Sequence, residues 1–90
     1  MSRSEKNKQF TDKVLVRFLN EIYVGKIKPA EVKHKSKYLL LLFTDYALEI
    51  HIGLNHNSEP SISYLIDSRT KKVLIVVEDK IASVLMKRFN

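Results

Sequence analysis

The chain of 90 residues contains no cysteine, no tryptophan, two glycines and two prolines. Without cysteine it can form neither a disulfide scaffold nor a thiolate metal site, and this favours a reducing compartment such as the cytoplasm. Two isolated glycines, Gly25 and Gly53, exclude a glycine-rich phosphate-binding loop. No apolar run approaches the roughly 18 residues that cross a bilayer, and the start, MSRSEKNKQ, lacks the apolar segment of a signal peptide. We therefore expect a cytoplasmic protein without membrane contacts.

The composition is that of an ordinary folded domain. Hydrophobic residues make up 44% of the chain and charged residues 29%, which is typical of a globular protein and not of a disordered one. Residues 1–10 are mostly polar and predict a flexible tail. We expect residues 11–90 to form a single small domain.

Two segments show the signals of amphipathic helices. Residues 11–24 carry apolar residues at helical spacing, with Thr11 as a potential N-cap and Gly25 just beyond the end. Phe10 and Leu15 are placed to form a hydrophobic staple across the start of this helix. Residues 79–89 begin acidic and end basic, which suits the dipole of a second helix.

Four segments between the helices have strand character. Residues 46–54 and 61–66 alternate between apolar and other residues, as strands with one solvated face do. Residues 37–43 and 73–77 are apolar on both faces, which favours central positions in the sheet. The sequence thus predicts an α+β domain of the order α-β-β-β-β-α, with a four-stranded antiparallel or mixed sheet. The strand order is either a meander or one with the two apolar strands adjacent at the centre.

A competing interpretation concerns the four leucines at 39–42. Leucine favours helices by intrinsic preference, and one helix through residues 36–54 would give a winged helix-turn-helix. Its reading helix, however, would present Asp45 and Glu49 to the phosphates of DNA, which repel them. We prefer the hairpin. Two helices cover only one face of its sheet, and a second copy of the chain is a candidate to cover part of the other, so we expect a homodimer.

No arrangement of residues indicates catalysis or metal binding. Glu49, His51 and His56 are the nearest approach to a metal-ligand set, but their spacing matches no recognised motif. The serines have no nucleophile elbow around them. We predict a protein that is not an enzyme, has no catalytic residues and uses no metal or cofactor.

Positive charge is concentrated early in the chain. Residues 1–37 hold ten Lys or Arg and four Asp or Glu, a net charge of +6, whereas residues 38–90 hold six of each. Such a basic pole favours an anionic partner. Lysines directly before an apolar strand also protect a sheet from edge-to-edge aggregation. The lysines therefore have two interpretations, protection of the sheet edge and binding of an anionic partner.

The sequence therefore predicts a small basic binding or regulatory protein. Its expected target is the phosphate backbone of nucleic acid, DNA or RNA, which point charges contact without reading bases. The alternative is a protein-protein interaction module, an inhibitor or adaptor that acts as a homodimer on an acidic protein partner. The predicted nucleic-acid-binding residues are Lys26, Lys28, Lys33, Lys35, Lys37, Arg69, Lys71 and Lys72.

Overall fold

A computed structural model describes residues 11–90, which contain two helices and a five-stranded antiparallel sheet. The first helix, α2 (Asp12–Tyr23), begins where the sequence predicts, with the Thr11 hydroxyl accepting a hydrogen bond from the Val14 N–H at 3.4 Å. It ends at Tyr23, and Gly25, two residues later, has a φ of 90°, the left-handed conformation that glycine adopts without strain. The staple predicted between Phe10 and Leu15 lies outside the described residues.

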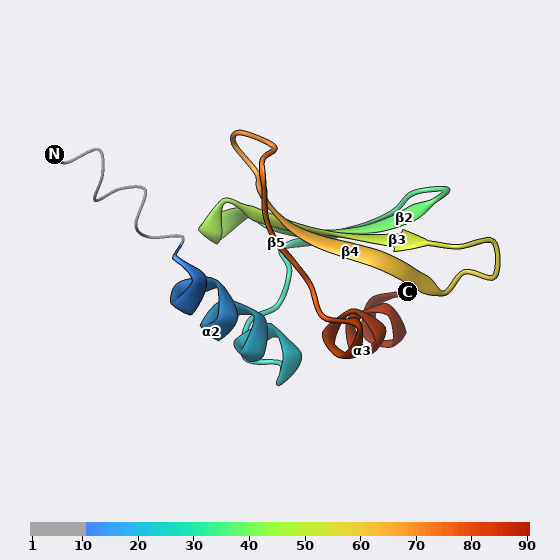
Figure 1. The fold of residues 1–90 in the computed structure, drawn as a ribbon, viewed down its shortest axis with the longest axis horizontal. Helices are drawn as coiled ribbons and strands as arrows, with labels where there is room; N and C mark the ends of the chain where they lie inside the picture. The colour runs from blue at the N-terminus through green and yellow to red at the C-terminus, as the bar shows by residue number, and fades with distance from the viewer. Residues whose placement is uncertain (1–10) are drawn as a thin grey trace, which may run out of the picture.

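The sheet is a meander (Figure 1) in which every strand pairs with its neighbours in the chain. Its strands are β1 (Glu31–His34), β2 (Tyr38–Phe43), β3 (Leu48–Leu54), β4 (Pro60–Asp67) and β5 (Val73–Val76). The prediction of four strands was wrong by one, because β1 was not expected. β1 is a strand because its backbone pairs with β2. Its side chains show little apolar patterning, so the sequence did not indicate it.

The segment 36–54 is a hairpin, so the winged-helix alternative is wrong. Leu39 lies opposite Ile52 and Leu41 opposite Ile50. Successive side chains of a strand point to opposite faces, and all four leucines are buried or half-buried. Burial on both faces of the sheet thus overrides the intrinsic preference of leucine for helix. A short 3-10 helix, η2 (Thr44–Tyr46), connects the two strands.

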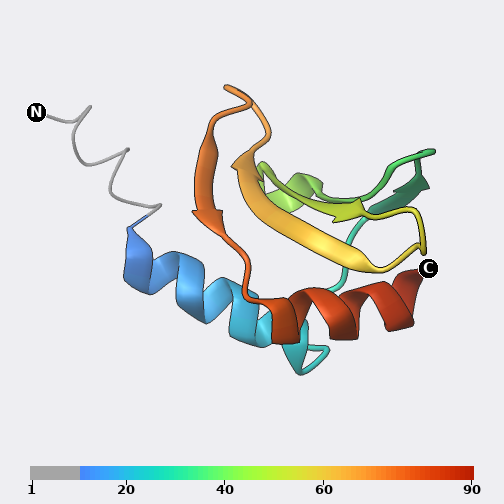
Figure 2. The same ribbon diagram turned by 45° about the vertical axis from the view of Figure 1, so that its right-hand side comes forward.

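Both helices lie on the same face of the sheet (Figures 1 and 2), and the hydrophobic core lies between them and the strands. The second helix, α3 (Asp79–Phe89), has the predicted bounds. Phe18 of α2 packs edge-on against Phe43 of β2, with 5.3 Å between ring centroids. The buried core residues are Leu15, Phe18, Leu19, Ile22, Leu39, Leu41, Phe43, Leu48, Ile50, Ile52, Leu65, Val77, Ile81, Ala82, Leu85 and Met86.

The other face of the sheet, called here the open face, has no helix over it in residues 11–90. Leu40 and Ile66 lie on this face and are largely buried by their neighbours, whereas Ile62 is 47% exposed. The two apolar strands of the prediction have different positions. Residues 38–43 form β2 inside the sheet, but residues 73–76 form β5 at its edge, contrary to the expectation of a central strand.

Candidate nucleic-acid interface

The β1–β2 hairpin carries three of the predicted lysines. Lys33 belongs to β1, and its Nζ lies 4.0 Å from a carboxylate oxygen of Glu31 on the same face. Lys35 and Lys37 lie in the turn, where the Lys35 N–H donates to the Tyr38 carbonyl at 2.9 Å and closes the hairpin. The three lysines are therefore exposed, but they do not follow one strand face.

The end of α3 is held against both the hairpin and the end of α2. An Nε2–oxygen distance of 3.0 Å joins His34 of β1 to the carbonyl of Phe89. The Arg88 guanidinium donates to the carbonyls of Ile22 and Tyr23, at 2.8 and 2.7 Å. Those carbonyls are at the end of α2, beyond the regular bonding pattern of the helix, and the Ile22 carbonyl also accepts from the Gly25 N–H at 3.1 Å. Arg88 thus fixes the end of one helix to the other.

Through these contacts, lysines from three segments flank the end of α3, and we call this group of lysines the basic end. Figure 2 shows the C-terminal end of α3 on the side of the sheet where the β1–β2 hairpin turns. The loop from α2 to β1 contributes two lysines, the hairpin three and the last turn of α3 one. Its residues are Lys26, Lys28, Lys33, Lys35, Lys37 and Lys87, all exposed.

Lys87 was missed by sequence reasoning. The basic end of residues 79–89 was visible in the sequence, but it was explained by the helix dipole alone. Its proximity to the hairpin depends on the contact between Phe89 and His34. Within residues 11–90, Lys33 is the one member of the basic end that forms an ion pair.

The remaining predicted residues, Arg69, Lys71 and Lys72, lie in the β4–β5 turn at the opposite end of the sheet. The strand register shows this, because Phe43 pairs with Leu48 and Leu48 with Asp67, which precedes the turn. The β1–β2 turn precedes Tyr38, at the other end of β2. Five residues of strand and the two turns separate the groups by roughly 20 Å. The fold therefore does not bring these three residues together with Lys35 and Lys37 of the β1–β2 turn.

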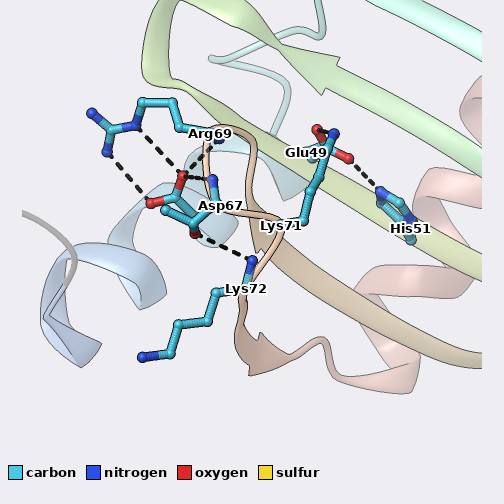
Figure 3. A network of polar contacts seen from close by, with 7 residues as sticks. Glu49, His51, Asp67, Arg69, Lys71 and Lys72 are labelled. Carbon is cyan, nitrogen blue, oxygen red and sulfur yellow. Dashed lines mark hydrogen bonds and ion pairs between the residues drawn. The ribbon is translucent and has the colours of Figure 1, made fainter.

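Lys71 is held by a buried carboxylate (Figure 3). Its Nζ lies 2.8 Å from an oxygen of Glu49, and the other oxygen accepts a hydrogen bond from His51. Glu49 is 1% exposed although it lies on the open face. Burial alone would raise the pKa of Glu49, but hydrogen bonds from Lys71, His51 and Ser68 outweigh it and hold the pKa below its usual value. The carboxylate is therefore ionised at neutral pH.

Arg69 is held by a second carboxylate in the same turn. An oxygen of Asp67 accepts from the backbone N–H of Arg69 at 2.8 Å and of Thr70 at 3.3 Å, which is an Asx turn. The Arg69 guanidinium approaches the other oxygen at 3.4 Å. Burial raises the pKa of Asp67, and these hydrogen bonds lower it further than burial raises it. Arg69 and Lys71 thus stabilise the turn, whereas Lys72 forms no ion pair within the described residues.

The potential metal ligands of the sequence do not converge. His51 contacts Glu49 and stacks on Tyr38, with ring centroids 5.4 Å apart, whereas His56 lies in the exposed loop between β3 and β4. Across residues 11–90, no group of three or more His, Asp or Glu side chains is arranged to hold a metal ion. We attribute the Glu49–His51–Lys71 network to stabilisation of the sheet.

The chain matches no protein-family model, no curated protein and no solved structure. No helix within residues 11–90 has the length and apolar character needed to span a bilayer.

Proposed function

We propose that this protein binds the phosphate backbone of nucleic acid through the basic end. The observation that supports this most strongly is the gathering of lysines from three chain segments around the end of α3. Five of the six have no carboxylate partner in residues 11–90, so their charge is available to a ligand. Exposed lysines act on phosphates as mobile point charges.

The chemistry of the basic end favours contacts to phosphates over contacts to bases. No aromatic side chain lies between the lysines of the hairpin tip, and Tyr38 is engaged in a stack on His51. Proteins that bind single strands by stacking need free aromatic rings, and these are missing at the hairpin tip. We therefore expect binding with little sequence preference and strong dependence on salt.

The proposal is tested by titrating fluorescently labelled duplex DNA, single-stranded DNA and duplex RNA with the protein at several salt concentrations. If about five phosphates are neutralised, log affinity for duplex DNA falls with log salt at a slope of roughly −4 to −5. The variant Lys35→Glu/Lys37→Glu should weaken binding at least tenfold and make the slope shallower. No binding at low salt, or binding that salt does not change, contradicts the proposal and leaves the acidic protein partner as the remaining prediction.

Lys13→Glu is the matched control. Lys13 is exposed in the first turn of α2, about 15 Å of helix before Tyr23 and away from the basic end. The change in charge is the same per site, and a glutamate in the first turn suits the helix dipole. Equal loss of affinity in this control would show that total charge, and not the basic end, governs binding.

A further inference from the structure

The edge strand β5 carries none of the charged or proline residues that guard many strand edges. One side of β5 pairs with β4, and no strand within residues 11–90 pairs with its other side. Its sequence, VLIV, contains no charge, proline or glycine, and Val73 and Val76 are 47% and 63% exposed. The opposite edge strand, β1, places Glu31 and Lys33 among its four residues. Proteins usually guard their edges in that way, because an open apolar edge pairs with other chains.

The backbone of β5 is oriented for such pairing. The Val77 N–H donates to the Ser63 carbonyl at 3.0 Å across the β4–β5 ladder. Bonded residues alternate along an antiparallel pair, so the polar backbone groups of Ile75 also point toward β4. Those of Val76, which lies between Ile75 and Val77, consequently point toward the free edge. The register of the β4–β5 pair shifts between Leu65 and Ile66, so this alternation does not extend to Leu74. An incoming antiparallel strand finds at Val76 both a donor and an acceptor.

The charges that flank β5 identify the partner. Lys71 and Lys72 precede the apolar run and Glu78 and Asp79 follow it, so the segment reads KKVLIVVED. Placed antiparallel to a copy of itself with Ile75 opposite Ile75, it sets Leu74 against Val76 and Lys72 against Glu78. In the single chain, neither Lys72 nor Glu78 forms an ion pair within residues 11–90, and Glu78 makes no side-chain capping bond.

We propose that β5 pairs with β5 of a second copy of this chain about a two-fold axis at Ile75. The charge order sets this register, and it places the outward backbone groups of Val76 against the segment of the second copy. The two sheets would then form one continuous ten-stranded sheet. An interface of this kind is isologous, because the same surface serves both partners.

A hollow beside the edge gives the second copy room to pack. It has a volume of about 140 Å³ and lies between β5, the middle of α2 and the start of α3. Its apolar lining consists of Val16, which is 53% exposed, together with Leu19, Ile75, Val76 and Ile81. Figure 2 shows β5 standing above the first half of α2, with the free edge facing outward. Strand pairing alone is a weak source of affinity, and burial of this apolar lining adds to it.

The proposal is tested by measuring mass in sedimentation equilibrium from roughly 1 μM to 1 mM protein. We expect a reversible dimer. Lys72→Glu or Glu78→Lys each converts two attractive contacts into two repulsive ones and should weaken the dimer about tenfold. The double variant Lys72→Glu/Glu78→Lys should restore it, because the charges are then exchanged. Lys35→Glu, at the basic end, is the control and should not alter the dimer.

Hydrogen exchange tests the register directly. The amide of Val76 should exchange several-fold more slowly as the protein concentration rises. The amides of Val32 and His34 in β1 are the controls. Because the Lys35 N–H bonds to Tyr38 and bonded residues alternate along the strand, these two amides point toward the outer edge of the sheet. These should exchange at rates independent of concentration. Three results would overturn the proposal. The first is a monomer at every concentration, and the second is a dimer that the single charge reversals do not weaken or that the double variant does not restore. The third is protection from exchange at β1 instead of β5.

Discussion

Replacing Lys71 by methionine should destabilise the protein, although the side chain of Lys71 is two-thirds exposed. Its ammonium group lies 2.8 Å from the carboxylate of Glu49, which is almost completely buried. Without Lys71 the carboxylate keeps its desolvation cost and loses its cationic partner. Methionine retains the length of the aliphatic chain, and it has no greater difficulty than lysine with the φ of 61° at this position.

The expected loss can be bounded from the contacts. Breaking a fully buried ion pair costs about 3–5 kcal/mol. Here water reaches Lys71, and Glu49 keeps its hydrogen bond with His51, so we expect a loss of about 1–2 kcal/mol at neutral pH. For a domain of this size that corresponds to a fall in melting temperature of roughly 4–16 °C. Lys72→Met, in the same turn but without an ion pair, should change stability by less than about 0.5 kcal/mol.

The assay is urea unfolding of the wild type and both variants at pH 7 and near pH 3. The pKa of Glu49 lies below its usual value in the folded protein, so its ionisation stabilises the fold above about pH 4.5. That contribution is lost as the pH falls through the folded pKa. The difference between Lys71→Met and wild type should therefore shrink in acid. An equal effect of both methionine variants, or a difference that is unchanged in acid, would refute the reasoning.

Three further predictions concern other buried or capping groups. Ser63 has a buried hydroxyl with no hydrogen-bond partner, so Ser63→Ala should raise the free energy of unfolding by about 1 kcal/mol in urea titrations, whereas Ser61→Ala, at an exposed hydroxyl, should not. Wild-type stability should decline as the pH falls below about 4, because the pKa values of both Glu49 and Asp67 are lowered by folding; a urea midpoint that is flat from pH 5 to pH 2 would contradict this. Arg88→Met should cost about 1–2 kcal/mol by calorimetry, since it leaves two carbonyls at the end of α2 without a charged donor, and no change would show that water replaces the guanidinium there.

The sequence predicted the elements whose signals are local. The helices at 11–24 and 79–89 have amphipathic spacing, and the first also has the Thr11 cap. The strand at 46–54 has clean alternation and appears as β3 from Leu48. β1 was missed because EVKH contains one apolar residue, and its strand character depends on backbone pairing with β2. The backbone hydrogen bonds of an exposed strand do not require apolar side chains, so the sequence of such a strand shows little alternation.

The candidate site was harder to predict because it depends on contacts between distant residues. Alternation placed Glu49 on a solvated face, yet it is buried, because Lys71, 22 positions later in the chain, returns to it through the β4–β5 turn. The cluster of charge before residue 38 is real, but the fold divides it between a loop and a hairpin. Lys87 joins those lysines from the far end of the chain, which no local pattern indicates.

The position of α3 has a consequence for synthesis of the protein. The sheet forms from neighbouring hairpins, and such local pairing is fast. The apolar face of the sheet that packs on the helices, however, is completed by Ile81, Ala82, Leu85 and Met86, which are synthesised after all five strands. A nascent chain that stops before Asp79 lacks α3 and exposes the apolar sheet surface that α3 would cover. Such a fragment should depend on chaperones, and premature termination should yield aggregates instead of a partially active domain.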